Sequence, residues 1–288
     1  MALLGYRVWD RTQRVFHWVN FLAVVTLAAL GTIILNADRL GIPDDPGMIN
    51  LKTVHVYVGY VFVLNLGWRL AWAFIGGPFA RWRALLPVGH RFQQRLREFL
   101  RGFAKGEAPF YLGHNPPARI ILSLIVLLLV VQGATGLFLA GTDVFMPPFG
   151  GTVREWVAAD THDPVLVRPY APETVNAEAW TRMREVRAPV VDVHEFNFYI
   201  LLLLIGIHIA AAVVTEFREG GTVISAMFTG TKIHEDVPVD LGEPGALPGR
   251  PAEQANEESD ASPGGSPPDP PPDDAADASV KATGASPE

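Results

Sequence analysis

The sequence contains no cysteine among its 288 residues. This absence excludes a cysteine-ligated iron–sulfur cluster, covalent haem attachment through a C-x-x-C-H motif, and a thiol nucleophile. Any redox metal bound by this chain must therefore be held by histidine, methionine or carboxylate side chains.

Large apolar residues and basic residues are both scarce after residue 235. Residues 236–288 contain twelve acidic and two basic side chains among many Pro, Gly, Ala and Ser, which gives them a net charge of −10 against −7 for the whole chain. Such a segment cannot bury enough apolar surface to offset the entropy lost on folding. We expect residues 1–235 to form one domain and residues 236–288 to be a disordered, acidic, Pro-rich tail, with no role in nucleic-acid binding.

What the first domain has in abundance is long apolar runs. Four stretches, at about residues 15–35, 53–75, 118–141 and 190–215, are long and apolar enough to cross about 30 Å of hydrocarbon. The first of them lacks the short apolar region and small-residue cleavage site of a signal peptide. We therefore predict an all-α membrane protein built as a bundle of four transmembrane helices, with residues 142–189 forming a long loop on the outer face.

The basic residues beside the spans predict the orientation of the bundle. They are concentrated before span one and between spans two and three. Each of the other two connections contains more acidic than basic residues. Both termini and the second connection should therefore face the cytoplasm. The basic residues on that side are Arg7, Arg11, Arg14, Arg81, Arg83, Arg91, Arg95, Arg97, Arg101, Lys105 and Arg119.

Four of the eight histidines fall near the ends of spans. His17 and His208 lie near the cytoplasmic ends of spans one and four, and His55 and His194 lie near the outer ends of spans two and four. In span four, the 14 residues between His194 and His208 leave the two side chains about 40° apart around the helix and about 21 Å apart along it. Span four thus presents one imidazole to each side of the membrane, on one face.

Two histidines at each level, from different helices, suit two non-covalent haems with two axial imidazoles each. Haem iron takes ligands on opposite sides of the porphyrin, so the ligands must come from facing helices. This arrangement pairs His17 with His208, and His55 with His194. Two alternatives stay open at this point: interfacial or interhelical hydrogen-bonding histidines, and a zinc site that adds the carboxylates flanking His194, which are Asp192 and Glu195.

Four segments resemble the bacterial cytochrome b561 / nickel–iron hydrogenase b-type cytochrome superfamily. They are RVWDRTQRVFHWVNF, LKTVHVYVGY, YLGHNPPAR and VHEFNFYILLLLIGIHIAA, and with a closing MFTGTK the resemblance extends from about Tyr6 to Ile233. It implies two haems b in a bacterial inner membrane, with electrons passing between the quinone pool and a redox partner. By this resemblance the axial ligands are His17, His55, His194 and His208. The long outer loop and the acidic tail depart from the family pattern, so the partner need not be a hydrogenase.

Four further polar residues near the cytoplasmic side are candidates for cofactor contacts. Arg14 and Arg69 either contact haem propionates or extend their side chains to the membrane interface. His114 and Asn115 either contribute to a quinone site or, since Asn115 precedes two prolines, mark the start of a helix.

The expected function is that of an electron-transfer subunit of a quinone-linked oxidoreductase, not a stand-alone enzyme. Its partner on the periplasmic face would be a hydrogenase, another dehydrogenase or reductase, or a cytochrome c. Two other classes stay open. The chain could be a non-redox membrane anchor that recruits a partner through residues 142–189, or a transporter whose histidines bind ions transiently.

Overall fold

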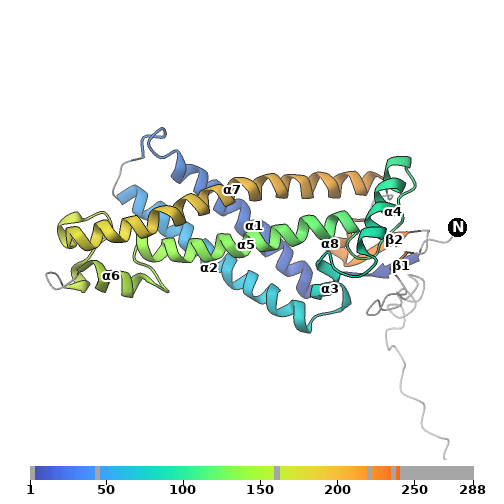
Figure 1. The fold of residues 1–288 in the computed structure, drawn as a ribbon, viewed down its shortest axis with the longest axis horizontal. Helices are drawn as coiled ribbons and strands as arrows, with labels where there is room; N and C mark the ends of the chain where they lie inside the picture. Colours follow the sequence, from blue (N-terminus) through green and yellow to red (C-terminus); the bar gives the residue numbers. More distant parts are fainter. Residues whose placement is uncertain (1–3, 43–45, 159–162, 219–221, 235–237, 241–288) are drawn as a thin grey trace, which may run out of the picture. The chain divides into compact units, whose positions relative to one another are not determined.

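The computed structural model describes residues 4–42, 46–158, 163–218, 222–234 and 238–240 (Figure 1). The described elements all belong to one compact unit, residues 1–252. The predicted tail lies outside the described residues, with the exception of residues 238–240.

The chain is mostly helical, and four of the helices are long and apolar enough to cross a membrane. They are α1 (Arg11–Leu35), α2 (Pro46–Ile75), α5 (Pro116–Asp143) and α7 (Ala177–Arg218). Each predicted span lies inside one of these helices, so the sequence-based prediction of four apolar spans is confirmed.

Side-chain caps define where two of these helices begin. Asp10 accepts a hydrogen bond of 2.7 Å from the backbone N–H of Gln13 at the start of α1. Asn115 accepts one of 2.9 Å from the backbone N–H of Ala118 at the start of α5, whose first two residues are prolines. Both contacts satisfy backbone donors that the first turn of a helix leaves without a partner.

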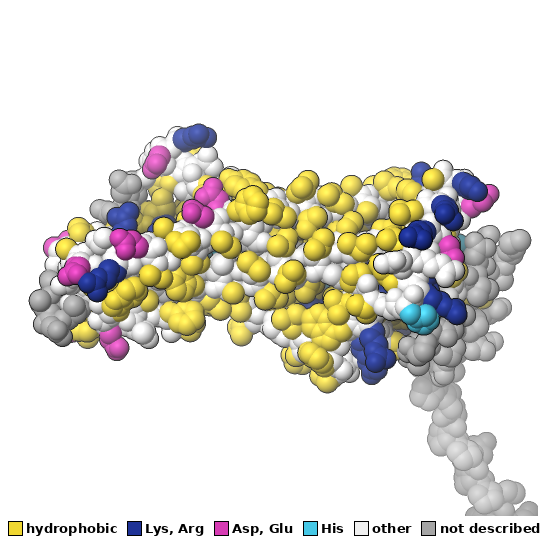
Figure 2. Space-filling view, viewed as in Figure 1, with side chains coloured by type: hydrophobic (Ala, Val, Ile, Leu, Met, Phe, Trp, Pro, Cys, Tyr) yellow, Lys and Arg dark blue, Asp and Glu magenta, His cyan; other side chains and the backbone are white. Residues whose placement is uncertain are grey.

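The four helices pack as a bundle whose outer surface is apolar. α1 contacts α2, α2 contacts α5, and α5 contacts α7. Figure 2 shows hydrophobic side chains over the middle of the visible face, with charged side chains gathered towards its two ends. An exposed apolar surface of this extent is typical of a face that contacts lipid or another protein. The interior between the helices is filled by Ala23, Phe62, Leu66, Ile125, Leu129 and Leu201.

One end of the bundle has a small folded cap, and we call it the α6 end. The cap consists of α6 (Gly150–Ala158), two short 3-10 helices, η3 (Pro164–Leu166) and η4 (Pro172–Thr174), and the first turns of α7. It has its own hydrophobic cluster, formed by Phe145, Val153, Val157, Ala158, Val167, Val175 and Met183, with Trp180 packed against it.

The prediction that residues 142–189 form a loop is wrong for its last part. α7 begins at Ala177 and continues through Pro189. Proline removes one backbone donor and disfavours a helix interior. The helix is nevertheless continuous here, because residues on its first turns, such as Met183 and Trp180, pack in the cap.

The opposite end, which we call the α4 end, contains short elements that the sequence did not predict. η1 (Pro78–Ala80), α3 (Trp82–Leu85) and α4 (Phe92–Lys105) connect α2 to α5, and α8 (Ala226–Thr229) follows α7. Figure 1 shows α4 and α6 at opposite ends of the bundle.

A two-stranded antiparallel sheet at the α4 end corrects the prediction of an all-α chain. β1 (Leu4–Arg7) pairs with β2 (Thr231–His234), with Leu4 opposite His234 and Arg7 opposite Thr231. Strands of four residues are too short to produce a periodic hydrophobic signal, and their partners are more than 200 residues apart in the sequence.

Asp240 fixes the connection that leads into α5. Its carboxylate accepts hydrogen bonds from the backbone N–H groups of Leu112 (2.8 Å) and Gly113 (2.9 Å). Lys232 on β2 donates to the carbonyl oxygen of Tyr111 in the same connection, at 2.9 Å. Residues 238–240, which the sequence-based boundary assigns to the tail, therefore help to hold the segment before α5.

We expect Asp240→Ala to destabilise the α4 end by about 2 kcal/mol, because two backbone donors, one of them buried, lose their acceptor. The measurement is the thermal denaturation temperature of the detergent-purified protein. Glu173→Ala, which removes an exposed carboxylate at the α6 end, is the control and should leave that temperature unchanged. Equal stability of the two variants would contradict this role for Asp240.

Candidate functional site

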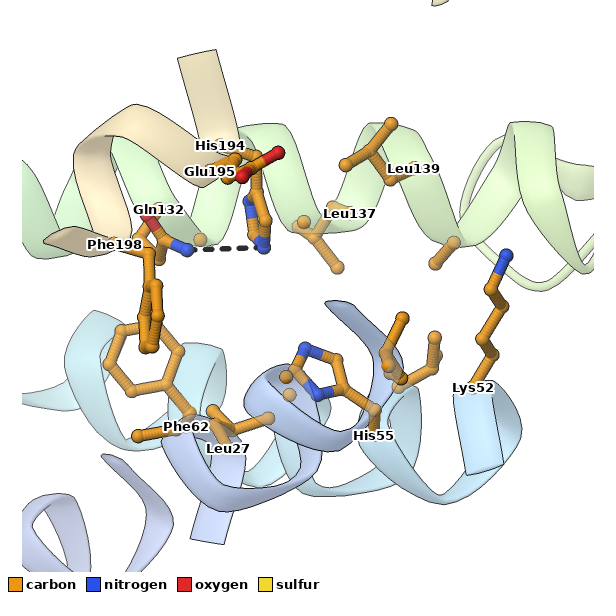
Figure 3. A pocket seen from close by; sticks show the side chains of 18 of the residues that line it. Leu27, Lys52, His55, Phe62, Gln132, Leu137, Leu139, His194, Glu195 and Phe198 are labelled. Atoms are coloured by element: carbon orange, nitrogen blue, oxygen red, sulfur yellow. Dashed lines mark hydrogen bonds between the residues drawn. The ribbon is translucent and has the colours of Figure 1, made fainter. Parts of the chain in front are cut away.

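A cavity of about 250 Å³ lies between the helices towards the α6 end of the bundle. His55 on α2 and His194 on α7 both line it. In Figure 3 the two imidazoles approach the cavity from opposite sides, and Phe62 and Phe198 lie at one end of it. The structure therefore brings together one of the two histidine pairs that the sequence predicted.

The hydrogen bonds of His194 favour one tautomer of its ring. The hydroxyl of Thr135 donates to the carbonyl of Val131 (2.8 Å), so its oxygen accepts from Nδ1–H of His194, also at 2.8 Å. Nε2 is then the nitrogen with the lone pair, and it accepts from the amide of Gln132 at 3.1 Å. An orienting bond at one ring nitrogen, with the lone pair at the other, is the usual arrangement of a histidine metal ligand.

Gln132 also connects this histidine to a second buried amide. Its side-chain oxygen accepts from the amide of Asn197, which donates to the carbonyl of Leu128 as well, at 3.0 Å. Asn197 is buried on α7, so the two amides satisfy each other inside the bundle. On the opposite wall, Nδ1 of His55 is buried and has no hydrogen-bond partner among the described residues.

Glycines from three helices line the same cavity. A Cβ atom on Gly136 would lie 3.3 Å from Cε1 of His194, and one on Gly31 would lie 3.6 Å from Cε1 of His55. A Cβ atom on Gly59, one turn after His55, would meet nothing within 4 Å. The helix backbones therefore approach both imidazoles closely and leave room for a flat ligand between them.

Three charged side chains line the cavity at its α6 end: Lys52 on α2, Asp143 on α5 and Arg187 on α7. Lys52 Nζ lies 2.6 Å from Asp143 Oδ2, and an Nη atom of Arg187 lies 3.1 Å from Asp143 Oδ1. The sequence-based prediction singles out none of these three residues and so misses the cluster. The available signal was spacing, because Lys52 precedes His55 by three residues and Arg187 precedes His194 by seven.

The second histidine pair lies towards the α4 end. His17 on α1 and His208 on α7 are close enough to interact electrostatically. The buried Nδ1 of His17 has no partner among the described residues. Next to it, Trp18 packs edge-on against the His17 ring and donates to the carbonyl of Met227 at 3.1 Å.

The two arginines near this pair contact backbone carbonyls. Arg14 donates to the carbonyl of Phe228, but its buried Nε has no partner in the described part of the chain. Arg69 is buried, donates to the carbonyl of Ala80 at 3.0 Å and lies over the ring of Phe16.

His114 and Asn115 have different surroundings. Asn115 caps α5 through its side-chain oxygen, as described above. The ring of His114 packs on Trp9 with centroids 4.9 Å apart, and its Nδ1 is buried without a partner among the described residues. Burial, together with the nearby cations of Lys232 and Arg69, lowers the pKa of His114 to about 3. This imidazole is therefore uncharged at neutral pH.

The zinc alternative finds no additional ligands in the described residues. No group of three or more His, Asp or Glu side chains there is arranged to hold a metal ion. Two imidazoles alone are a poor zinc site.

Comparison with known proteins places the whole bundle in one group. The family model of prokaryotic cytochrome b561 matches residues 8–230. The chain is 25% identical to a probable Ni/Fe-hydrogenase B-type cytochrome subunit of Cupriavidus necator, over 80% of this chain and 87% of that protein. It is 22% identical to the protein of that name from Rhizobium leguminosarum bv. viciae, over 80% of this chain and 89% of that one. A probable Ni/Fe-hydrogenase 1 B-type cytochrome subunit of Escherichia coli is 21% identical, over 81% and 93%. No solved structure matches the chain.

Proposed function

The chain belongs to the prokaryotic cytochrome b561 family, and from that premise we propose that it is a membrane electron-transfer subunit with two haems b. It exchanges electrons between a membrane quinone and a redox partner protein. The family and the four apolar helices make the chain a multi-pass membrane cytochrome of the b type. The number of haems, their ligands, the quinone and the partner are our proposals.

The observation that carries this proposal is the apolar cavity with one imidazole on each side. Its residues fit a haem: Thr135 orients His194 so that Nε2 is the acceptor nitrogen, glycine backbones adjoin both rings, and the other lining side chains are mainly apolar. The amide of Gln132, which bonds Nε2 in this structure, would have to release it. We assign His55 and His194 as the axial ligands of one haem and His17 and His208 as those of the other.

When bound, haem b supplies a carrier for one electron at a time. The protein's part is to hold the ligands without motion and to exclude water from the site. Thr135 orients His194, and α7 supplies one imidazole to each pair, about 21 Å apart along the helix. Electrons can therefore cross the bundle without any rearrangement of the helices.

We propose that the α4 end faces the cytoplasm of a bacterial inner membrane and that the α6 end faces the periplasm. The excess of arginine and lysine before α1 and between α2 and α5 supports this orientation. The cap at the α6 end is then the docking surface for the partner. Several relatives are named as hydrogenase cytochrome subunits, which supports a hydrogenase as that partner.

We place quinone exchange at the α4 end, beside the His17–His208 pair. His114 supports this location because it lies against Trp9 and has a buried ring nitrogen without a partner among the described residues. Its other ring nitrogen bonds the backbone of Ala84 and the ring is uncharged at neutral pH, so the unpartnered Nδ1 is an acceptor. It would therefore hold the hydroxyl of a quinol. Asn115 caps a helix, so we propose a smaller role for it. Of the two arginines, Arg14 is the better candidate for a propionate contact, because its Nε has no described partner.

A reduced-minus-oxidised optical spectrum of the purified full-length protein tests the proposed function. We expect a b-type spectrum and about two haems per chain. A protein without haem would favour the anchor or the transporter.

His114→Ala should slow the reduction of the haems by a quinol analogue about tenfold, while the optical spectrum stays unchanged. His90→Ala, which changes an exposed histidine at the same end, is the control. An unchanged rate in His114→Ala would move the quinone site elsewhere.

A further inference from the structure

The Lys52–Asp143–Arg187 cluster has more cationic hydrogen-bonding capacity than its single shared carboxylate uses. The Lys52 ammonium has three donors and contacts Asp143 and the hydroxyl of Tyr170. Arg187 contacts Asp143 through one Nη, while its buried Nε has no partner in the described part of the chain. The ammonium of Lys52 and the guanidinium of Arg187 therefore each have donors that Asp143 does not use.

The cluster is placed at one edge of the histidine cavity, and all three members contribute to its lining. Lys52 lies about 4.5 Å along α2 from His55, and Arg187 lies two turns, about 10.5 Å, along α7 from His194. Asp143 lies two turns along α5 from Gly136, whose backbone adjoins His194. On each helix the charged residue is displaced from the imidazole level towards the α6 end.

The cluster is also shielded from solvent. The side chains of Lys52, Asp143 and Arg187 are 17%, 23% and 26% exposed. Charges at this depth need partners, and their mutual attraction is weakly screened. The other acidic group of the cavity, Glu195, lies beside His194 and away from Lys52 in Figure 3, and it borders a second depression that contains Arg39.

We propose that Lys52 and Arg187 bind the two carboxylates of the tetrapyrrole held by His55 and His194, and that Asp143 occupies both cations in its absence. This inference rests on the proposed function. Haem has an apolar body with two propionates on one edge, and the cavity has an apolar body with two cations at one edge. Asp143 then competes with the propionates, while the contact of Lys52 with Tyr170 connects the haem edge to the cap.

Opposite effects of the cations and of Asp143 test this inference. Lys52→Gln and Arg187→Gln should each shift the reduction equilibrium of this haem about tenfold towards the oxidised form, which is about 59 mV for one electron. They should also accelerate loss of the haem severalfold. Asp143→Asn should shift the equilibrium in the opposite direction and should not accelerate haem loss. Potentiometric titration of the full-length protein measures these shifts. Arg182→Gln, which breaks an exposed ion pair on α7 away from the cavity, is the matched control.

A probe without carboxylates identifies the contacted groups. Apoprotein reconstituted with the dimethyl ester of haem b should lose the ester equally fast from Lys52→Gln and from the unaltered chain, because the ester offers no anion to Lys52. If the cluster only holds three helices together, Asp143→Asn and Lys52→Gln will accelerate haem loss alike. The ester, like haem, will then be lost faster from Lys52→Gln than from the unaltered chain. That result would overturn the inference while two haems per chain still upheld the proposed function. A chain without haem would overturn both.

Discussion

His194→Ala is expected to halve the haem content of the purified protein, because one axial ligand of a bis-imidazole site is lost. His55→Ala should remove the same haem, since the two rings face one cavity. His17→Ala and His208→Ala should remove the other haem and leave the first. The pyridine haemochrome assay gives the content, and a redox titration shows which component is missing in each variant.

The pairing itself is what these variants test. The four proteins should fall into two groups of two, and His90→Ala, in an exposed loop, should behave like the unaltered chain. Four variants that all kept their full haem content would refute the assignment. If His17→Ala and His55→Ala removed the same haem, the proposed pairing of each with a histidine on α7 would be refuted.

Gly59→Phe is expected to produce a comparable loss without touching any ligand. Gly59 lines the cavity, and a Cβ atom there meets nothing within 4 Å. A phenyl ring would occupy much of a space of about 250 Å³ that we assign to the macrocycle. Phenylalanine is also a better helix former than glycine, so the substitution does not lower the helix propensity of α2. Haem content should fall by about half, with normal expression and membrane insertion.

Two comparisons make this result specific. Gly59→Ala adds only a methyl group and should retain both haems. Gly151→Phe places the same ring in open space on α6, outside the cavity, and should also retain both. If Gly59→Phe retained two haems, the cavity between His55 and His194 would not be the binding site.

The parts of the fold that follow from local composition could be predicted from the sequence. The four spans were recognised because each is a long apolar run, and the placement of histidines at two levels followed from those spans. The spacing of 14 residues put His194 and His208 on one face of α7. The structure brings His55 and His194 to one cavity, and it places His17 and His208 near each other.

The parts that depend on contacts between distant residues could not be predicted. The pairing of β1 with β2 and the bonds from Asp240 to Leu112 and Gly113 join segments more than 100 residues apart. In the sequence, Thr135 is one small residue of an apolar helix. Its hydrogen bond to His194 is seen only in the folded bundle, where α7 packs against α5. In the sequence, Lys52 and Arg187 look like ordinary charges at the membrane interface. Only the folded structure shows that both form ion pairs with Asp143 at the cavity.

The contribution of α7 to both histidine pairs has a consequence for biosynthesis. α7 is the last of the four spans to leave the ribosome, and it supplies His194 and His208 together. With the proposed ligands, neither haem site is complete while only α1, α2 and α5 are in the membrane. Cofactor loading must then follow insertion of the whole bundle, so a nascent or prematurely terminated chain that ends before residue 194 would not sequester haem.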